Sequence, residues 1–265
     1  MPSISVTTNS TSADYIDVYW ETNFGGDTSY RVLRGEAYSG PFDPVTEPLY
    51  DRYQIRDYIA PRKYAWRSLY YVIEATHANG EVVRSEPTSL KARPPLDALE
   101  MIRLNSLLFK EYNGRPCLIY VRRTFGEHCS ICYDEVTHVQ LTKNCTDCYG
   151  TGYARGYHRP MYAYVNIGAD AQSIMPQQQM VTGQHTTQGR MSIYPIVKPG
   201  DLVVEQEGVR WRVQNVTYTE RLRSPVQQML TLFRVPEGDI EHRIPVQWDD
   251  AVETSPRSFS PRSDL

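Results

Sequence analysis

Several features that would define a membrane protein or an enzyme are missing from this sequence. No run approaches the roughly 20 consecutive apolar residues that a membrane-spanning helix needs. Residues 1–4 also lack the charged segment that precedes an apolar one in a secretory signal. The sequence contains no Gly-rich phosphate loop, no Gly-x-Ser-x-Gly elbow and no His-Glu-x-x-His motif. We therefore expect a protein that folds in a cytoplasm, makes no membrane contact and is not an enzyme.

A strong excess of charge of one sign is also absent. The 28 Lys and Arg residues face 31 Asp and Glu residues, which gives a formal net charge of −3 at pH 7. Proteins that bind nucleic acid usually carry clustered positive charge.

The acidic pairs at residues 134–135 and 249–250 are sequence neighbours, whose side chains point to opposite faces of a strand, so neither makes a carboxylate dyad.

Cysteine is scarce, with five in 265 residues, but four of the five form two Cys-x-x-Cys pairs. The pairs are Cys129 with Cys132 and Cys145 with Cys148. This spacing lets each pair direct two sulfurs at one tetrahedral ion, whereas a disulfide inside Cys-x-x-Cys closes a small, strained ring. Four unengaged thiols are the remaining alternative. We predict a Zn²⁺ ion held by these four cysteines, in agreement with a reducing compartment.

A shell of four thiolates leaves no position for a reactive water, so the predicted zinc is structural and no catalytic residue is assigned. His128 and His138 lie beside and between the pairs, and we interpret them as surface histidines instead of ligands or bases. Gly150 and Gly152 follow the second pair and give the backbone the conformational freedom that a metal knuckle needs. The fifth cysteine, Cys117, is expected to be a small buried hydrophobe.

The composition and the apolar patterning predict a mainly β protein. Tyrosine is abundant, with 20 residues against 6 phenylalanines, and it suits half-buried strand and interface positions. Residues 1–93 are predicted to form one β-sandwich, because residues 16–21, 30–34, 53–58 and 69–75 alternate between apolar and polar. Asn79-Gly80 adds a strong hairpin signal before residues 81–87.

This first region resembles a fibronectin type III domain. The resemblance lies in the strand that carries Trp20, in Tyr30-x-Val32, in Tyr70-x-x-Ile73-x-Ala75, in Asn79-Gly80 and in Ser85-Glu86-Pro87. It implies that Tyr70 forms the tyrosine corner of the family, and that the domain serves as a spacer or an adhesive decoration.

A linker at residues 91–95, with paired prolines, is predicted to separate a second, α+β domain at residues 96–248. That domain begins with a helix at residues 96–112, which Asn113-Gly114 ends. Strands are expected at residues 116–121, 161–167, 202–205, 209–216, 226–235 and 240–246. The last four make a C-terminal β-meander or small barrel. The glutamine-rich residues 171–191 are predicted to be a long loop, and residues 249–265 a flexible C-terminal tail.

The second domain resembles tailed-bacteriophage virion proteins of the neck, the connector or head-to-tail adaptor rings between portal and tail. The residues that carry this resemblance are the two cysteine pairs with Tyr149-Gly150-Thr151-Gly152-Tyr153, Gly156-Tyr157 and Pro160, then Lys198-Pro199-Gly200-Asp201 and Gly208-x-Arg210-Trp211-x-Val213. The Cys-x-Gly-Thr-Gly block also resembles the zinc module of J-domain chaperones, which repeats the motif four times.

The phage resemblance implies a virion structural protein that assembles in the host cytoplasm into a homo-oligomeric ring. Its expected partners are other copies of itself, other virion proteins such as the portal, the tail terminator or the tube, and passing DNA through non-specific contact. The glutamine-rich loop and the C-terminal tail are expected to supply contacts. Two alternatives stay open, a baseplate or other tail structural protein and a zinc-ribbon nucleic-acid-binding protein. The second would need more Lys or Arg than the single Lys143 between the pairs.

Overall fold

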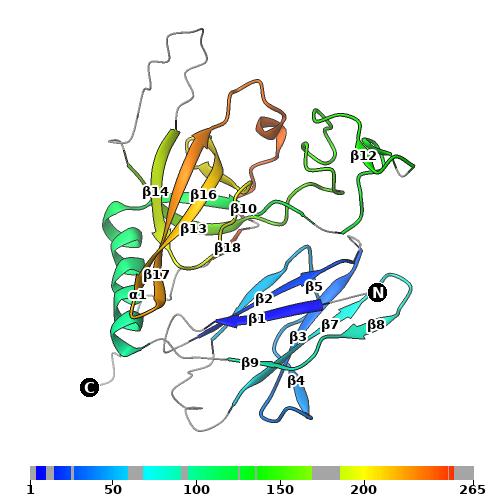
Figure 1. Ribbon diagram of the computed structural model, residues 1–265, viewed down its shortest axis with the longest axis vertical. Helices are drawn as coiled ribbons and strands as arrows, with labels where there is room; N and C mark the ends of the chain where they lie inside the picture. Colours follow the sequence, from blue (N-terminus) through cyan, green and yellow to red (C-terminus); the bar gives the residue numbers. More distant parts are fainter. Residues whose placement is uncertain are drawn as a thin grey trace.

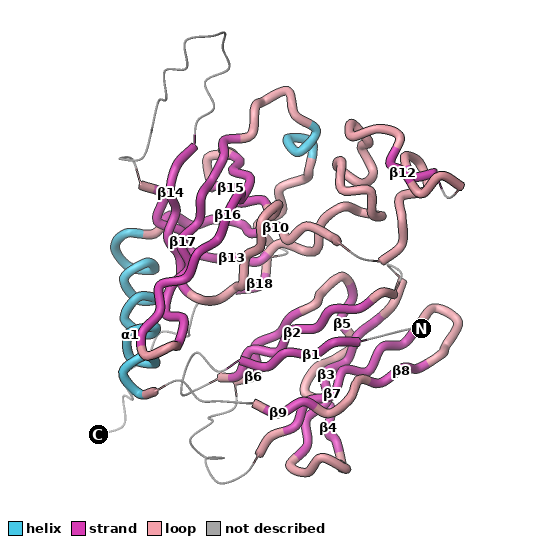
Figure 2. Tube along the Cα trace, viewed as in Figure 1, coloured by secondary structure: helices cyan, strands magenta, loops and turns pink. Residues whose placement is uncertain are grey.

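The structure is a computed structural model of the chain, and its architecture is mainly β, as the sequence predicts (Figure 1). An N-terminal domain of paired strands lies below a second domain, which carries the one α-helix of the described residues and a loop-rich lobe at the opposite side (Figure 2). The described residues are 4–9, 15–24, 27–58, 68–90, 95–124, 126–134, 136–168, 186–249 and 251–253. The predicted linker lies largely outside them, since it includes residues 91–94.

The N-terminal domain consists of two sheets that enclose one apolar core. Trp20, Val32 and Ile73 are almost fully buried between the sheets, because alternate residues of each strand face inward. This arrangement matches the predicted β-sandwich. The first sheet has the order β1 (Ile4–Asn9), β2 (Ile16–Thr22), β6 (Gln54–Asp57), and the second the order β4 (Phe42–Pro44), β3 (Ser29–Gly35), β7 (Tyr70–Thr76), β8 (Val82–Arg84), with β5 (Leu49–Tyr50) paired to β3 and β9 (Thr88–Ser89) paired to β7.

The tyrosine expected to form a corner is not the buried one. Tyr70 is only half-buried and meets the ring of Tyr38 edge to face. Its neighbour Tyr71 is fully buried and donates a hydrogen bond from its hydroxyl to Asp57 over 2.9 Å. The alternation of β7 therefore directs Tyr71, and not Tyr70, into the core.

The second domain is built around a closed antiparallel barrel. Strands follow one another around it in the order β10, β15, β16, β17, β14, β13, and β10 pairs with β13 to close the ring. Its interior is filled by inward-facing residues such as Ile119, Val165 and Leu232. The predicted small barrel is thus present, with more strands than the four expected. The strand bounds are β10 (Arg115–Tyr120), β13 (Met161–Ile167), β14 (Thr186–Ser192), β15 (Leu202–Glu205), β16 (Arg210–Arg221) and β17 (Ser224–Arg234).

The predicted helix forms and covers the outside of the barrel. Helix α1 (Leu96–Leu108) continues into a π-helical turn, η1 (Phe109–Asn113), and Gly114 ends it as expected. The buried side of α1 packs Ala98 and Ile102 against Val226 of β17. A Cβ atom at Gly114 would lie 2.2 Å from the carbonyl oxygen of Phe109, so only glycine fits this close approach.

Three sequence predictions in this domain are wrong in detail. Part of the glutamine-rich segment, expected as loop throughout residues 171–191, belongs to β14, while residues 169–185 lie outside the described part of the chain. Residues 240–246, expected as a strand, begin with a short 3-10 helix, η3 (Ile240–Arg243). The expected tail includes β18 (Val252–Glu253), which pairs in parallel with β13 before the undescribed residues 254–265.

The two domains meet at a junction of aromatic and charged side chains. Arg56 of β6 lies 3.8 Å from the ring centre of Tyr15 and 4.0 Å from that of Tyr194 in the second domain. Its Nε donates over 2.8 Å to the fully buried carboxylate of Asp17. A further ion pair, Arg123 with Asp51, also crosses the junction with both side chains largely buried. Buried ion pairs of this kind fix the position of one domain relative to the other, because separating the partners would leave an unpaired charge in an apolar environment.

Candidate metal centre

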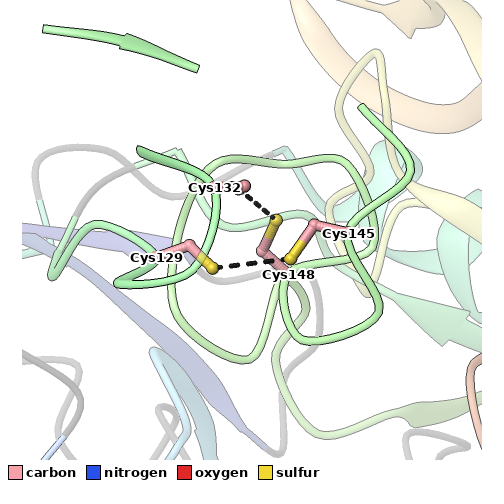
Figure 3. A group of neighbouring side chains, drawn as sticks. All are labelled: Cys129, Cys132, Cys145 and Cys148. Carbon is pink, nitrogen blue, oxygen red and sulfur yellow. Dashed lines mark hydrogen bonds between the residues drawn. The ribbon is translucent and has the colours of Figure 1, made fainter. Parts of the chain in front are cut away.

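The four predicted ligands converge at the centre of the loop-rich lobe, between residues 126 and 157 (Figure 3). All four cysteines are buried, and their Sγ atoms lie within 4.8 Å of one another. Cys129 and Cys145 are 3.7 Å apart and Cys132 and Cys148 are 3.3 Å apart, measured between Sγ atoms. Four sulfurs at about 2.3 Å from a tetrahedral ion would be about 3.8 Å from each other. The observed spacing therefore suits one ion in the middle, and the four cysteines could hold a metal.

Backbone N–H groups point at two of the sulfurs, which is what a thiolate ligand requires. The amides of Ile131 and Cys132 turn toward the Sγ of Cys129. In the second knuckle, burial opposes ionisation of Cys145, but the amides of Asp147 and Cys148 outweigh it and lower the pKa of that thiol to about 7.

Two of the other thiols, those of Cys129 and Cys132, resist ionisation when no cation is present. Burial, followed by hydrogen bonding among the neighbouring sulfurs, raises the pKa of Cys132 well above its ordinary value. Burial likewise raises the pKa of Cys129. Four negative sulfurs in so small a volume need a cation between them, so the donor set fits a divalent metal.

Unusual backbone conformations bring the second knuckle into place. Gly150, Gly152 and Gly156 all have positive φ, at 80°, 83° and 65°. A Cβ atom at Gly156 would lie 2.4 Å from the carbonyl oxygen of Cys148, and one at Gly150 would lie 2.7 Å from that of Lys143. Both glycines are therefore required by close backbone contacts, and the prediction that glycines follow the second pair for a structural reason is confirmed.

The lobe has hardly any core apart from the cysteines. Among its described residues, the regular structure consists of a two-stranded hairpin of β11 (Tyr133–Asp134) and β12 (Val139–Gln140). The cysteines form a buried cluster of their own, separate from the apolar clusters inside and outside the barrel. The shape of the lobe accordingly depends on whatever joins the four sulfurs.

The two histidines lie outside the cluster. His128 is exposed and stacks on the ring of Tyr133, with ring centres 3.7 Å apart and planes 2° from parallel. Tyr153 lies 5.0 Å away on a nearly parallel plane. His138 is also exposed and has a positive φ of 53°. Among the described residues, the potential ligand group contains cysteines alone.

The fifth cysteine behaves as predicted. Cys117 is fully buried inside the barrel and does not belong to the cluster of the other four cysteines. Burial raises the pKa of its thiol to about 12, with a smaller contribution from the negative charge of Glu205. A thiol with so high a pKa stays protonated at neutral pH and acts as a small apolar side chain.

Sequence reasoning missed one neighbour of the sulfurs, Gln140. Its side-chain Nε2 lies 3.7 Å from the Sγ of Cys132 and 3.9 Å from that of Cys148. The same amide donates to the carbonyl oxygen of Thr142 over 3.0 Å. An amide N–H that points at a thiolate holds that ligand in position without binding the metal itself. The spacing within the loop gives no signal for this residue.

Comparisons with known proteins assign no family to the chain. No family model matches the sequence, and no curated protein matches it. Within the described residues, every helix is too short or too polar to pass through a lipid bilayer.

Proposed function

We propose that this chain is a structural subunit of a tailed-phage virion, which forms an oligomeric ring in the neck, or head-to-tail connector, region. The observation that carries the proposal is the way the second domain is built: a closed barrel joined to a lobe that is held by four cysteines and has little core of its own. The lobe has no open ligand position for chemistry, and it extends from the barrel as a surface for contact. The phage-neck resemblance of the cysteine block and of the barrel turns supports the same assignment.

We infer that the metal is Zn²⁺ and that its role is structural. Four thiolates favour zinc or an iron–sulfur centre, and a mononuclear tetrahedral site with knuckle amides is typical of zinc. When bound, the ion would supply the cohesion that the lobe lacks in apolar contacts. The residues that would hold it are Cys129, Cys132, Cys145 and Cys148.

The charges of the domain junction also favour a rigid building block. The guanidinium of Arg155, a basic residue of the lobe, lies 3.8 Å from the carboxylate of Asp27 and 4.0 Å from that of Asp51, both in the N-terminal domain. An arginine engaged in this way holds the lobe toward the N-terminal domain. We propose that partners are met mainly through protein surfaces, and that any contact with DNA is secondary.

Electron microscopy of the purified protein tests the proposal. Closed rings, and matching density between head and tail in a virion that carries the protein, are the expected results. Density at the baseplate would favour the alternative tail role. Tight binding of DNA by a monomer at low salt, together with an absence of rings, would contradict the proposal. Elemental analysis of the same sample should give one zinc per chain.

A further inference from the structure

The hairpin of β16 and β17 ends in a turn that its sequence does not favour. Arg221 pairs with Ser224, so the loop has two residues, Leu222 and Arg223. Both have positive φ, at 50° and 63°. Two-residue turns of this hand are normally Asn-Gly or Asp-Gly, because a side chain at positive φ costs energy. The sequence keeps a leucine and an arginine in this turn although they strain the backbone, which is typical of side chains with a function.

The tip is exposed and basic, and it is presented rigidly. We define the hairpin tip as Tyr218, Arg221, Leu222 and Arg223. Leu222 is 62% exposed and Tyr218 is 45% exposed, so the tip offers both side chains for contact. Neither arginine takes part in an ion pair with any described residue. Just after the turn, Val226 packs against α1, which fixes the base of the tip.

A second exposed apolar surface lies on the lobe. We define the lobe face as Ile131, Val136, Val139 and Leu141, whose exposed fractions are 69%, 88%, 55% and 70%. Four exposed apolar side chains this close together in the sequence make the lobe a candidate for protein contact.

The charge around the lobe face is negative. Among the described residues of the lobe, 126–134 and 136–157, three carboxylates, Glu127, Asp134 and Asp147, outnumber Lys143 and Arg155, and Arg155 faces Asp27 and Asp51 of the N-terminal domain. Four thiolates around one divalent ion would add a formal charge of −2 to the lobe. An apolar surface set in negative charge is complementary to an apolar tip flanked by arginines.

The two surfaces lie at opposite sides of the second domain and cannot meet within one chain. In Figure 1 the hairpin tip lies beside the lower end of α1, whereas the lobe that contains β12 lies across the barrel on the other side. A contact between two different surfaces of identical chains is heterologous, and repeating it produces a ring or an open helix.

We propose that the hairpin tip of one copy docks on the lobe face of the next copy, with Leu222 entering the apolar surface and Arg221 and Arg223 facing its carboxylates. This inference rests on the proposed ring and names its repeating contact. It also gives the cysteine centre a purpose, since the centre holds the docking surface in shape.

Two complementary variants test the contact. The tip variant is Leu222→Asn with Arg223→Gly, which installs the favoured turn, so its thermal stability should equal or exceed that of the wild type. The lobe variant is Val136→Lys with Leu141→Lys, and its metal content reports whether the lobe stays folded. Val82→Lys, at a 52% exposed apolar residue of the N-terminal domain, is the matched control. Each sample is examined by sedimentation velocity across a dilution series.

The expected result is specific to a heterologous contact. Each variant alone should be monomeric, with its association weakened about thirtyfold or more, while the control should assemble like the wild type. An equimolar mixture of the two variants should form dimers and no larger species, because one intact tip then meets one intact lobe.

Other outcomes overturn the inference in distinguishable ways. If both variants form rings, the contact lies elsewhere and the ring itself stands; loss of rings in Leu104→Asp would then assign it to the exposed side of α1. Dimers of one variant alone would indicate a contact between identical surfaces. A wild type that stays monomeric throughout would refute both the contact and the proposed ring.

Discussion

Replacing Cys145 with serine is the most informative single perturbation of the metal centre. A serine hydroxyl does not ionise near neutral pH, so three thiolates remain and the shell is open. The free energy with which structural zinc binds is about 10–16 kcal/mol in small zinc modules. That equals or exceeds the roughly 5–15 kcal/mol of a whole domain. Loss of the ion should therefore be enough to unfold any part that depends on it.

The structure shows which part that is. Beyond the cysteines, the lobe between residues 126 and 157 contributes few buried side chains, and its regular structure is limited to β11 and β12. The barrel has a separate core of buried side chains from all six of its strands. We expect Cys145→Ser to release the metal and unfold the lobe while the barrel stays folded.

Hydrogen exchange and elemental analysis measure the two effects separately. Amides of residues 126–157 should lose protection in Cys145→Ser, and those of β10, β13 and β17 should keep it. Cys117→Ser is the matched control: it should retain the metal but destabilise the barrel by about 1–3 kcal/mol, because a buried hydroxyl replaces an apolar thiol. The reasoning is refuted if Cys145→Ser keeps a full equivalent of metal, or if it loses the metal and the lobe stays protected.

Three further predictions concern the junction and the knuckle. Arg56→Met strands a fully buried carboxylate and should cost about 3–5 kcal/mol in urea unfolding. Arg103→Met, which removes a pair in solvent, should leave the urea midpoint nearly unchanged, and equal shifts in the two variants would contradict the argument from burial. Burial lowers the pKa of His158 to about 3, from about 6.5 in an unfolded chain. The contribution of the neutral imidazole to folding stability is therefore complete above about pH 6.5 and is lost as pH falls toward 3. His158→Phe should flatten the acid slope by up to about 1.4 kcal/mol per pH unit, and an unchanged slope would refute this. Gly156→Ala should weaken the retention of metal against a chelator, while Gly208→Ala, also at positive φ but in open space, should not.

The sequence predicted the metal ligands and most of the strands for clear physical reasons. Cys-x-x-Cys spacing is a local geometric property, so it survives whatever the rest of the chain does. Strands such as β13, with its strict alternation of buried and half-buried residues, are visible because one face must be apolar. The sandwich and the barrel follow from such strands and their turns.

One missed element depends on a contact that is distant in sequence, and the other on a local helix cap. β14 alternates too, but its inward positions include Thr187 and Gly189, which carry no apolar signal. Glycine is required there because a Cβ atom would lie 2.8 Å from the Cδ1 of Leu232 on β17. The segment at η3 reads as a strand, yet the carboxylate of Asp239 accepts from the amide of Ile240 and starts a helical turn. The packing at Gly189 is known only from the fold, whereas the cap at Asp239 is a local signal that the apolar pattern of residues 240–246 outweighed.

The closure of the barrel has a consequence for how such a protein behaves when many copies are crowded together. Open sheet edges invite strand addition and uncontrolled aggregation, and a ring of strands has none to offer. Among the described strands of the barrel, β16 is longer than its partner β15, so residues 214–221 of β16 form an exposed edge. A bulge near Thr219 and the charges of Glu220 and Arg221 discourage strand pairing there. The barrels of neighbouring copies are thus left to recognise one another mainly by side chains, which can be specific, and not by backbone pairing, which cannot.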